Sequence, residues 1–376
     1  MSGKTLFAGL REAVERRHVD VRRGTTASAL VQDASGGVIG VECRTVVASA
    51  VPWPAVHRRL SRLARKWNLY FRPFGRRIDS VITWIERTQS VSTRFHADRG
   101  VVIAAGGFSF DRVAVTEHAP AFRRGTPLGT TGDDGSGIAL GVAAGGAVDR
   151  MDKMSAWRFF NPPLAMVGGV LVNSAGERLC DESLYGATIG SVIAAQPDSK
   201  AYLIIDEKIR RRAASQILGQ CLWFQALQAV FMLTVGARSA RDVRSLARVC
   251  GMNPDTLAAA VETYSDDARA GRPDAFGKNP DYVVPLQSGR VHAIECSIRA
   301  QTGFPCPVIT LGGLKVSEDD GAVMSTAGQP ITGLYAIGRS AVGLCSESYV
   351  SGLSIADCVF SGRRTGTALS NTRKVS

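Results

Sequence analysis

The sequence is poor in the residues that build metal sites and disulfide frameworks. Its 376 residues include 5 histidines and 8 cysteines, and no two cysteines stand in a C-x-x-C pair. Zinc sites and disulfide-stapled folds normally need such clusters. We therefore expect no metal site, and we expect the thiols to be reduced, as in cytosolic proteins.

A membrane-spanning segment and a signal peptide are also not indicated. The longest apolar region, residues 217–235, is interrupted by Gln220, Gln225 and Gln228, which are costly in lipid without partners. This region is better interpreted as a buried helix. Residues 1–20 carry charges through what would be the apolar part of a signal peptide. The sequence predicts a cytoplasmic protein.

The chain lacks the pattern of a complete dinucleotide-binding unit, in which a strand, G-x-G-x-x-G and a helix precede a ribose-binding acid. The segment GSGIALG at residues 135–141 has the spacing G-x-G-x-x-x-G, and no apolar strand precedes it. We therefore do not interpret it as a phosphate-binding turn.

Positive charge is present in excess and is concentrated in one segment. The formal net charge is +12, and residues 51–94 contain ten Lys or Arg against two acids, Asp79 and Glu86. Aromatic and aliphatic residues alternate with these cations, which suits a basic amphipathic helix on an anionic membrane surface. A solvated basic helix packed on its own domain explains the pattern equally well. No nucleic-acid-binding fold surrounds the segment, so we expect no nucleic-acid partner.

The order of patterns predicts a discontinuous α/β domain with a second domain inserted. Strand-like runs at 19–23, 28–33 and 38–42 predict a β-meander, which the basic segment interrupts. Residues 101–105 form an apolar strand followed by Gly106 and Gly107. Residues 150–300 are richer in helices, and the strand-and-glycine pattern returns at Val308. We expect three regions, at 1–150, 151–305 and 306–376.

Several segments, taken in order, resemble one flavoprotein family. They are GVVIAAGGF (100–108), TGDDGSGIALGVAAGGA (131–147), GGVLVNSAGERLCDES (168–183) and GLYAIG (333–338), followed by SGLSIADCVFSGRRTG (351–366). The family contains fumarate reductases, succinate dehydrogenase flavoprotein subunits and 3-ketosteroid Δ1-dehydrogenases. The resemblance implies a two-part, Rossmann-like FAD-binding domain with an inserted α+β cap domain. Chains of this family begin with the G-x-G-x-x-G unit, so we expect this chain to be N-terminally truncated.

The resemblance also implies which residues contact FAD. These are Gly106 and Gly107 at the strand end, Asp134 in the TGDDG loop, Gly338 and Arg339 after YAI, and Ser354 and Ile355 at the last helix. Asp133 is an alternative alignment for the acid, and Asp134 is equally consistent with a helix N-cap. Backbone amides at the helix start would face an electron-rich carbonyl of the flavin.

The substrate residues of fumarate reductases are absent from the matching positions. Tyr349 stands where an arginine is expected, Val308 and Ile309 stand near an expected histidine, and Met166-Val167 stand near the proton-donating arginine. The resemblance to ketosteroid dehydrogenases implies that Tyr349, with Gly352 in the following turn, binds a ketone oxygen. The family's glycine is one position away from Gly352. We expect an apolar ketone or steroid as substrate.

The residue that would remove the proton is left open between Tyr185 and Tyr282, and His292 is interpreted as structural. One alternative is an inactive, truncated relative that binds lipid or a membrane surface. A fumarate reductase is the third possibility, which the missing arginines disfavour.

Overall fold

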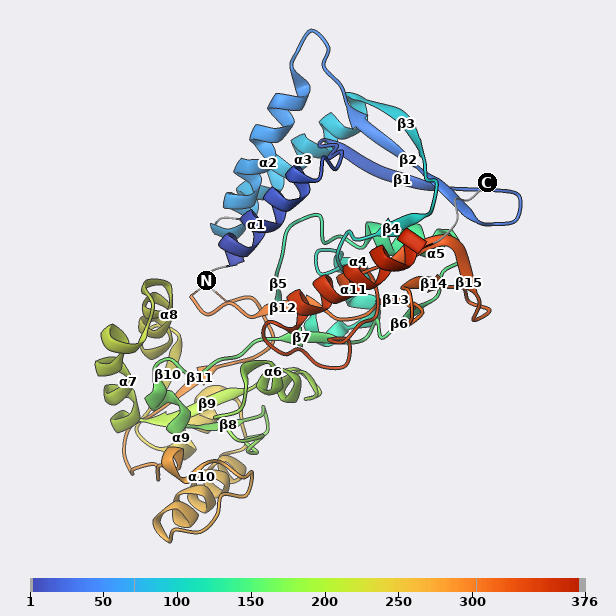
Figure 1. Cartoon of the computed structure of the whole chain (residues 1–376). Coiled ribbons are helices and arrows are strands. Elements are labelled where there is room, and N and C mark those ends of the chain that lie inside the picture. Colours follow the sequence, from blue (N-terminus) through green and yellow to red (C-terminus); the bar gives the residue numbers. More distant parts are fainter. Residues whose placement is uncertain (1–2, 71, 302, 372–376) are drawn as a thin grey trace. The chain divides into compact units, whose positions relative to one another are not determined.

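The structure is a computed structural model that describes residues 3–70, 72–301 and 303–371 (Figure 1). Contacts divide the chain into two compact units, one up to Val101 and one from Val102 to Asn371. We call them the N-terminal unit and the main unit, and we describe each by itself. The predicted boundaries at 150 and 305 stay a prediction.

The N-terminal unit is built on a three-stranded antiparallel sheet. Its strands are β1 (Thr25–Gln32), β2 (Val38–Val46) and β3 (Ser90–His96), in the order β1-β2-β3. Helix α1 (Gly3–Arg16) precedes the sheet. The turn between β1 and β2 is held by Asp33, whose Oδ1 accepts the N–H groups of Ser35 and Gly37 at 2.8 and 2.9 Å.

The predicted strand at 19–23 is wrong. In the structure, residues 90–96 provide the third strand, because β2 pairs with β1 on one side and with β3 on the other. Val19 and Val21 are more than half exposed and have no strand beside them. The predicted meander therefore exists, but its last strand comes after the basic segment.

The basic segment forms a helical hairpin of α2 (Trp53–Tyr70) and α3 (Arg72–Thr88). Ala64, Ile78 and Ile85 are buried. Trp53 and Trp84 meet edge to face with ring centroids 5.7 Å apart. Much of the apolar side of each helix is thus used inside the N-terminal unit. The exposed cations of the hairpin, among the side chains that the structure describes, are Arg58, Arg59, Arg62, Arg76, Arg77 and Arg87.

The main unit contains two small sheets assembled from distant parts of the chain. One has the order β14-β15-β4, with β14 (Ala322–Met324), β15 (Pro330–Ala336) and β4 (Val101–Ile103). The other has the order β5-β12-β7, with β5 (Thr126–Pro127), β12 (Pro307–Thr310) and β7 (Met154–Ala156). Residues before 160 and after 300 therefore share sheets, which confirms the predicted discontinuous fold.

Helices and a short ladder complete this part of the main unit. They are α4 (Arg112–His118), α5 (Ser136–Ala143), α11 (Leu353–Asn371) and the pair β6 (Val148–Asp149) with β13 (Gly313–Leu314). Helix α5 approaches the end of β4 closely at Gly137, where a Cβ would lie 2.7 Å from that of Ala105. Only glycine permits this approach.

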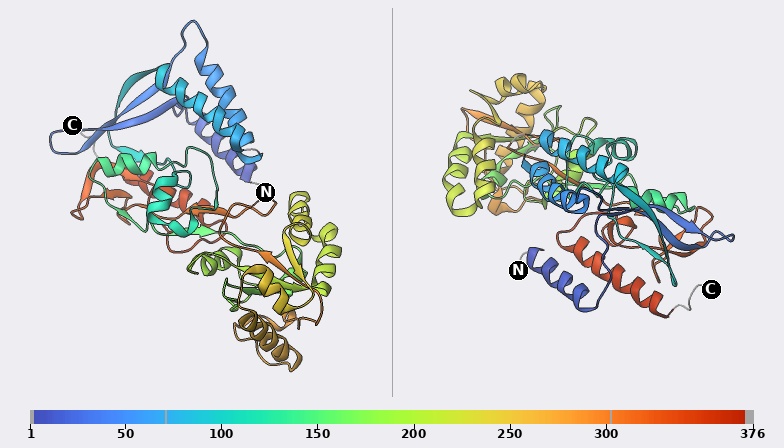
Figure 2. Two further views of the ribbon diagram at one scale, coloured as in Figure 1. Left: turned by 180° about the vertical axis from the view of Figure 1, so that it is seen from behind. Right: turned by 90° about the horizontal axis from the view of Figure 1, so that it is seen from above.

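The segment between β7 and β12 forms its own antiparallel sheet, with the order β10-β11-β9-β8. We call this segment the cap. Figures 1 and 2 show helices α7 and α8 on one side of the sheet and α9 and α10 on the other. Every residue of β9 is buried, as expected for a strand covered on both faces. The bounds are β8 (Val170–Val172), α6 (Gly186–Ala194), β9 (Tyr202–Asp206), α7 (Glu207–Gln220), α8 (Trp223–Leu233), β10 (Ala237–Ala240), α9 (Val243–Cys250), α10 (Pro254–Arg269) and β11 (Val291–Glu295).

The prediction of one buried helix over residues 217–235 is wrong. Helix α7 ends at Gln220, α8 begins at Trp223, and Leu218, Trp223 and Leu227 are 95%, 71% and 65% exposed. Only one side of α8 packs on the cap, through Ala229, Met232 and Leu233. Among the helices that the structure describes, none combines the length and hydropathy needed to cross a bilayer.

Arg158 ties together the two chain segments that enter and leave the cap. Its side chain is fully buried and donates to backbone carbonyls of the returning segment, with its guanidinium 4.4 Å from the ring centroid of Phe304. Carbonyl dipoles stabilise this buried cation in place of a carboxylate, and stacking on Phe304 adds to this effect. The carbonyls belong to Cys296, Ser297, Arg299, Phe304 and Pro305.

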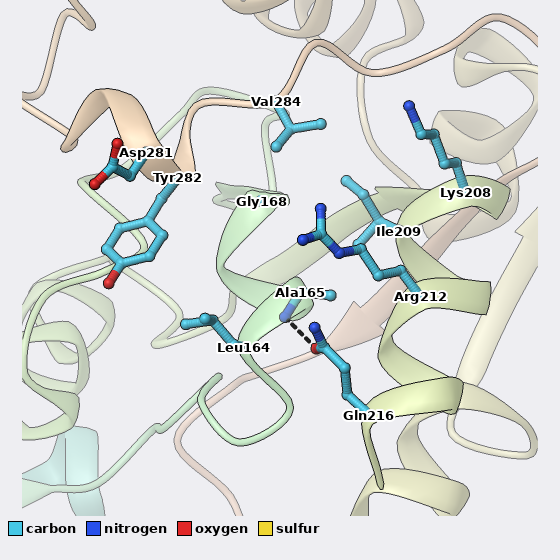
Figure 3. A pocket seen from close by; sticks show the side chains of 10 residues that line it. All are labelled: Leu164, Ala165, Gly168, Lys208, Ile209, Arg212, Gln216, Asp281, Tyr282 and Val284. Carbon is cyan, nitrogen blue, oxygen red and sulfur yellow. Dashed lines mark hydrogen bonds between the residues drawn. The ribbon is translucent and has the colours of Figure 1, made fainter. Parts of the chain in front are cut away.

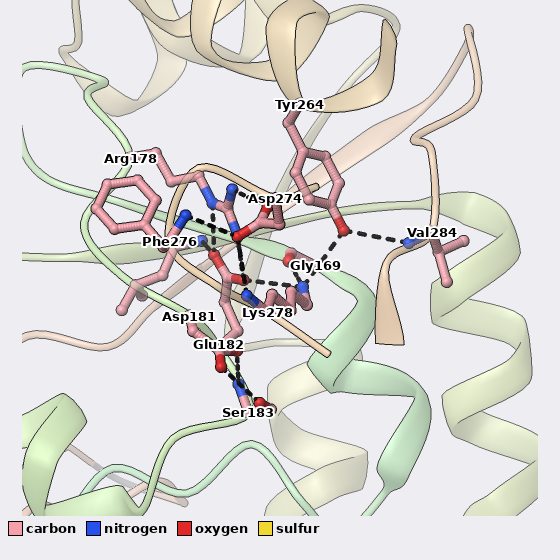
Figure 4. Close-up of polar contacts among 11 residues, drawn as sticks. Gly169, Arg178, Asp181, Glu182, Ser183, Tyr264, Asp274, Phe276, Lys278 and Val284 are labelled. Carbon is pink, nitrogen blue, oxygen red and sulfur yellow. Dashed lines mark hydrogen bonds and ion pairs between the residues drawn. The ribbon is translucent and has the colours of Figure 1, made fainter. Parts of the chain in front are cut away.

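A buried cluster of charges holds the cap loops to β8 (Figure 4). Lys278 Nζ donates to Glu182 Oε2 at 2.8 Å, to the Gly169 carbonyl at 3.0 Å and to the Tyr264 hydroxyl at 3.3 Å. Arg178 binds Glu182 and also Asp274. Glu182 further accepts the N–H of Leu171 in β8 at 2.8 Å. The Glu182 carboxylate therefore faces two cations and one amide.

We predict that Glu182→Gln lowers the free energy of unfolding by about 3–5 kcal/mol, because it leaves buried Lys278 without its negative partner. Urea denaturation of the whole chain measures this change. Glu177→Gln, at an exposed residue of the same loop, is the matched control and should change stability little. Equal effects of the two substitutions would contradict the role assigned to Glu182.

Candidate functional site

The Asp133 carboxylate joins loops from three regions of the main unit. Its Oδ1 accepts the N–H of Gly107, at the end of β4, at 2.5 Å. Both carboxylate oxygens accept from the guanidinium of Arg339, each at 2.8 Å. Such a two-point arrangement of arginine and carboxylate fixes orientation as well as distance. The strand end, the TGDDG loop and the loop after β15 therefore form one structure.

Two hydroxyl groups make further hydrogen bonds between these loops. The Ser340 hydroxyl accepts the N–H of Gly106 and donates to the Gly106 carbonyl, both at 3.0 Å. The Thr310 hydroxyl accepts the N–H of Phe108 at 3.2 Å. Strand β12, which carries Thr310, is thereby connected to the same loop.

The two glycines at the end of β4 are required by this packing. Gly106 has φ +90°, and a Cβ there would lie 2.5 Å from Asp133 Oδ1. A Cβ at Gly107 would lie 2.1 Å from the Thr310 hydroxyl. Larger residues would push the two loops apart.

The structure brings together the predicted residues Gly106, Gly107 and Arg339. Gly338 connects them to α11, because its N–H donates to the Ser361 hydroxyl at 3.0 Å. Asp134 lies outside the cluster: its side chain is exposed and accepts the N–H of Ser136 at 3.0 Å, at the start of α5. Of the two alternatives, Asp133 is the acid that lies in the cluster with Gly106, Gly107 and Arg339.

Tyr349 lies in a group of aromatic side chains between the start of α11 and the cap. Its ring centroid is 5.0 Å from that of Trp157, and Phe159 meets Tyr185 at 5.8 Å. Burial raises the pKa of Tyr349, a hydrogen bond with Ser354 opposes this shift, and neighbouring Tyr185 raises the pKa further. The Tyr349 phenol is therefore protonated at neutral pH and can donate a hydrogen bond.

The start of α11 carries the other predicted residues. The helix begins at Leu353, after Gly352 with φ +84°. The first amides of a helix have no acceptor within the helix and form the positive end of its dipole. Ser354 and Ile355 contribute such amides, and their side chains are half-buried and exposed, respectively.

A cleft of about 470 Å³ runs beside α11, within the size range of ligand sites. Gly338, Gly343 and Asp357 are among its lining residues. Gly343 is close to Asp357, whose carboxylate would be 2.5 Å from a Cβ at that position. The cleft and the Asp133 cluster thus share the loop that contains Gly338 and Arg339.

The two tyrosines proposed for proton removal lie in different places. Tyr185 belongs to the aromatic group that contains Tyr349. Tyr282 lines a separate pocket of about 120 Å³ in the cap, together with Lys208 and Arg212 of α7 (Figure 3). The geometry therefore favours Tyr185.

His292 is part of the cap sheet, as the sequence analysis expected. It is buried in β11, and its ring nitrogens contact the Ser239 hydroxyl at 2.7 Å and the Glu207 carboxylate at 2.9 Å. Burial lowers its pKa, which the bond with Glu207 partly offsets. Both ring nitrogens of His292 therefore have hydrogen-bond partners within the cap, which indicates a structural role.

We predict that Asp133→Asn lowers the free energy of unfolding by about 2–3 kcal/mol, because Arg339 loses its charged partner in a largely buried setting. Thermal unfolding followed by circular dichroism measures the change. Asp134→Asn is the control, since asparagine also caps a helix start. A larger loss in the Asp134 variant would show that the roles of the two acids are reversed.

Comparison with known proteins agrees with these features. The sequence model of the family described as "FAD binding domain" matches residues 1–350. The chain is 34% identical over 342 residues to 3-oxo-5-alpha-steroid 4-dehydrogenase of Comamonas testosteroni, covering 90% of this chain and 63% of that protein. It is 26% identical over 279 residues to NADH:fumarate oxidoreductase of Klebsiella pneumoniae, covering 71% and 28%.

Among solved structures, the fold resembles the 3-ketosteroid-delta4-(5alpha)-dehydrogenase of Rhodococcus jostii RHA1 in complex with 4-androstene-3,17-dione. The TM-score is 0.70 at 26% identity, over 96% of this chain and 62% of that one. The chain thus spans somewhat less than two thirds of the length of these steroid dehydrogenases. The resemblance indicated by the sequence motifs is confirmed. Because the family match extends over most of its length, the chain belongs to the FAD binding domain family.

Proposed function

We propose that the protein is an FAD-dependent dehydrogenase that introduces a double bond into a 3-ketosteroid or a similarly flat, apolar ketone. The observation that carries this proposal is the protonated phenol of Tyr349, placed at the start of α11 and surrounded by aromatic side chains. The two steroid relatives are named for dehydrogenation at position 4. We therefore favour position 4 over the position 1 suggested by the sequence resemblance.

The residues of the site fit a flavin. Tight turns at Gly106 and Gly338, the cleft beside α11 and the amides of Ser354 and Ile355 offer close backbone approach and positive charge density. Arg339, oriented by Asp133, adds a cation. When bound, FAD supplies an acceptor for the hydride that leaves the carbon next to the deprotonated one. In this proposal Asp133 positions Arg339, and Asp134 only caps α5.

Tyr349 would donate its hydroxyl proton in a hydrogen bond to the ketone oxygen. Loss of a proton from the adjacent carbon builds negative charge on that oxygen, and a preorganised donor stabilises it. Tyr185 is the candidate acceptor for this proton, because it lies in the same aromatic group as Tyr349. The carbon next to the ketone loses a proton, and the carbon beside it loses a hydride. The double bond forms between these two carbons.

The positions at or beside which fumarate reductases would carry substrate-binding residues hold no cation in this chain. Val308, Ile309, Met166 and Val167 are all buried apolar residues. Arg158 is also buried, and its donors are occupied by backbone carbonyls. The fumarate reductase alternative would require cations that bind carboxylates in pairs.

A second proposal concerns the basic hairpin, which we suggest contacts an anionic membrane surface. Trp84 and Leu63 are exposed next to exposed arginines of α2 and α3. This combination of cations and interfacial aromatic residues favours peripheral binding. Apolar steroids concentrate in membranes, so such binding would bring a ketosteroid dehydrogenase close to its substrate.

We predict that protein incubated with FAD has the absorption spectrum of a flavoprotein and reduces an artificial acceptor dye when a 3-ketosteroid is added. Tyr349→Phe should lower kcat by about 10²- to 10³-fold, because it removes the oxyanion donor. The phenyl ring still packs on Trp157, so the fold should persist. Tyr282→Phe, the same change in the separate cap pocket, is the control. A colourless protein would argue against the enzyme, and a fully active Tyr349→Phe variant would remove Tyr349 from the chemistry.

We predict that changing Arg58, Arg62 and Arg76 to Glu reduces binding to phosphatidylserine vesicles on the order of 100-fold, since each surface cation contributes about 1 kcal/mol. Cosedimentation measures the binding. A variant with Arg241, Arg244 and Arg248 changed to Glu has the same net charge, and it should retain most of the binding. Equal loss in both variants would indicate nonspecific attraction, and unchanged binding would reject the hairpin as the contact surface.

A further inference from the structure

Trp157 carries a buried hydrogen-bond donor that has no partner. In the part of the chain that the structure describes, the buried side-chain polar atoms without a partner are Ser155 Oγ, Trp157 Nε1 and Arg364 Nε. A buried N–H without an acceptor costs about 1–3 kcal/mol. Native proteins leave few such groups unpaired, and each one calls for an explanation.

The position of this donor points to the proposed site. The indole ring of Trp157 lies against the phenol of Tyr349, with centroids 5.0 Å apart and the planes at 47°. Ser155 of β7, which also has an unpaired buried hydroxyl, precedes Trp157 by two residues, and Trp157 directly follows the end of that strand. Two of the three unpaired groups thus occur within three residues, at the end of β7 and directly after it, where Trp157 contacts Tyr349.

The backbone that carries the Trp157 indole is held on both sides of the cap connection. The backbone N–H of Trp157 donates to the Pro307 carbonyl at 3.0 Å, and this bond fixes the Trp157 backbone to the chain segment that returns from the cap. The next residue, Arg158, is held by the carbonyls of that same segment. The unpaired donor is therefore set in place by the two segments that connect the cap to the rest of the main unit.

We propose that the Trp157 indole donates a hydrogen bond to a carbonyl oxygen of the ligand bound beside Tyr349, and that it is a specificity-determining residue. An indole N–H is a donor only, so its partner must be an acceptor. A carbonyl oxygen has two lone pairs and can accept from Trp157 and Tyr349 together. The inference rests on the proposed function and adds to it a second donor for the ketone.

The carbonyl could belong to the 3-oxo group of a steroid or to the flavin, and both have the same chemistry. In either case the N–H is paired only when the ligand is present. A steroid without the 3-oxo group would leave the donor unpaired in a buried site. Sites of this kind reject analogues that lack the hydrogen-bonding group much more strongly than apolar pockets do.

The test compares wild-type protein with Trp157→Phe, which removes the N–H and keeps an aromatic ring over Tyr349. Trp223→Phe, the same change at an exposed position of α8, is the matched control. The readouts are the thermal unfolding midpoint and the dissociation constants of three probes: FAD, 4-androstene-3,17-dione, and the same steroid lacking the 3-oxo group. Trp157→benzothienylalanine, which replaces N–H by sulfur in a ring of similar size, provides the answer if the Phe variant does not fold.

We expect the preference of the wild type for the 3-oxo steroid to fall about 10-fold in the Trp157 variant, with an unfolding midpoint no lower than that of the Trp223 control. If the preference for the 3-oxo steroid falls and the affinity for FAD is unchanged, the carbonyl that accepts from Trp157 belongs to the steroid. Weaker FAD binding with the steroid preference retained assigns it to the flavin. If neither value changes, the inference is wrong while the proposed function stands. A wild-type protein that binds none of the probes overturns both.

Discussion

The site depends on a single buried carboxylate, that of Asp133. It receives the N–H at the end of β4 and the guanidinium of Arg339, which lies more than 200 residues later in the chain. The close approach of these loops requires glycine at positions 106 and 107. This contact adds a buried ion pair to the two hydrogen bonds that Ser340, in the same loop as Gly338 and Arg339, makes to Gly106 at the strand end. The same loop also holds α11, because the N–H of Gly338 donates to the Ser361 hydroxyl in the body of that helix.

The cap depends on a different set of buried charges. Arg158 fixes the two connecting segments through backbone carbonyls, and Glu182 holds Arg178 and Lys278 within the cap. Neither group of contacts contains a residue with the freedom to act on a substrate. The contacts of Arg158 also fix the backbone of the residues beside it in the chain. Trp157 is the clearest case, because it directly precedes Arg158.

The character of the site is apolar and hydrogen-bonding, with little charge. Tyr349 and Tyr185 provide hydroxyl groups, and Trp157 and Phe159 provide ring surfaces. In such surroundings a neutral donor is more effective than in water, and an unpaired one is more costly. This balance supports the flat, apolar ketone that we propose as the substrate.

The sequence by itself determined the family, the discontinuous order of the fold, the glycine turn after β4 and the helix that begins near Ser354. These features depend on local patterns, such as apolar runs and glycines, which can be recognised without knowing which residues pack against them. Only the tertiary structure showed that Asp133, and not the adjacent Asp134, contacts Gly107 and Arg339. It alone placed Tyr349 against Trp157 and showed the indole nitrogen of Trp157 without a partner. It also showed that the third strand of the meander is formed by residues 90–96 and not by 19–23, and that much of the apolar segment 217–235 is exposed to solvent. Those outcomes depend on contacts between residues that are far apart in the chain. Two neighbouring residues of the same type, such as Asp133 and Asp134, differ only in the direction in which their side chains point, and the sequence does not give that direction.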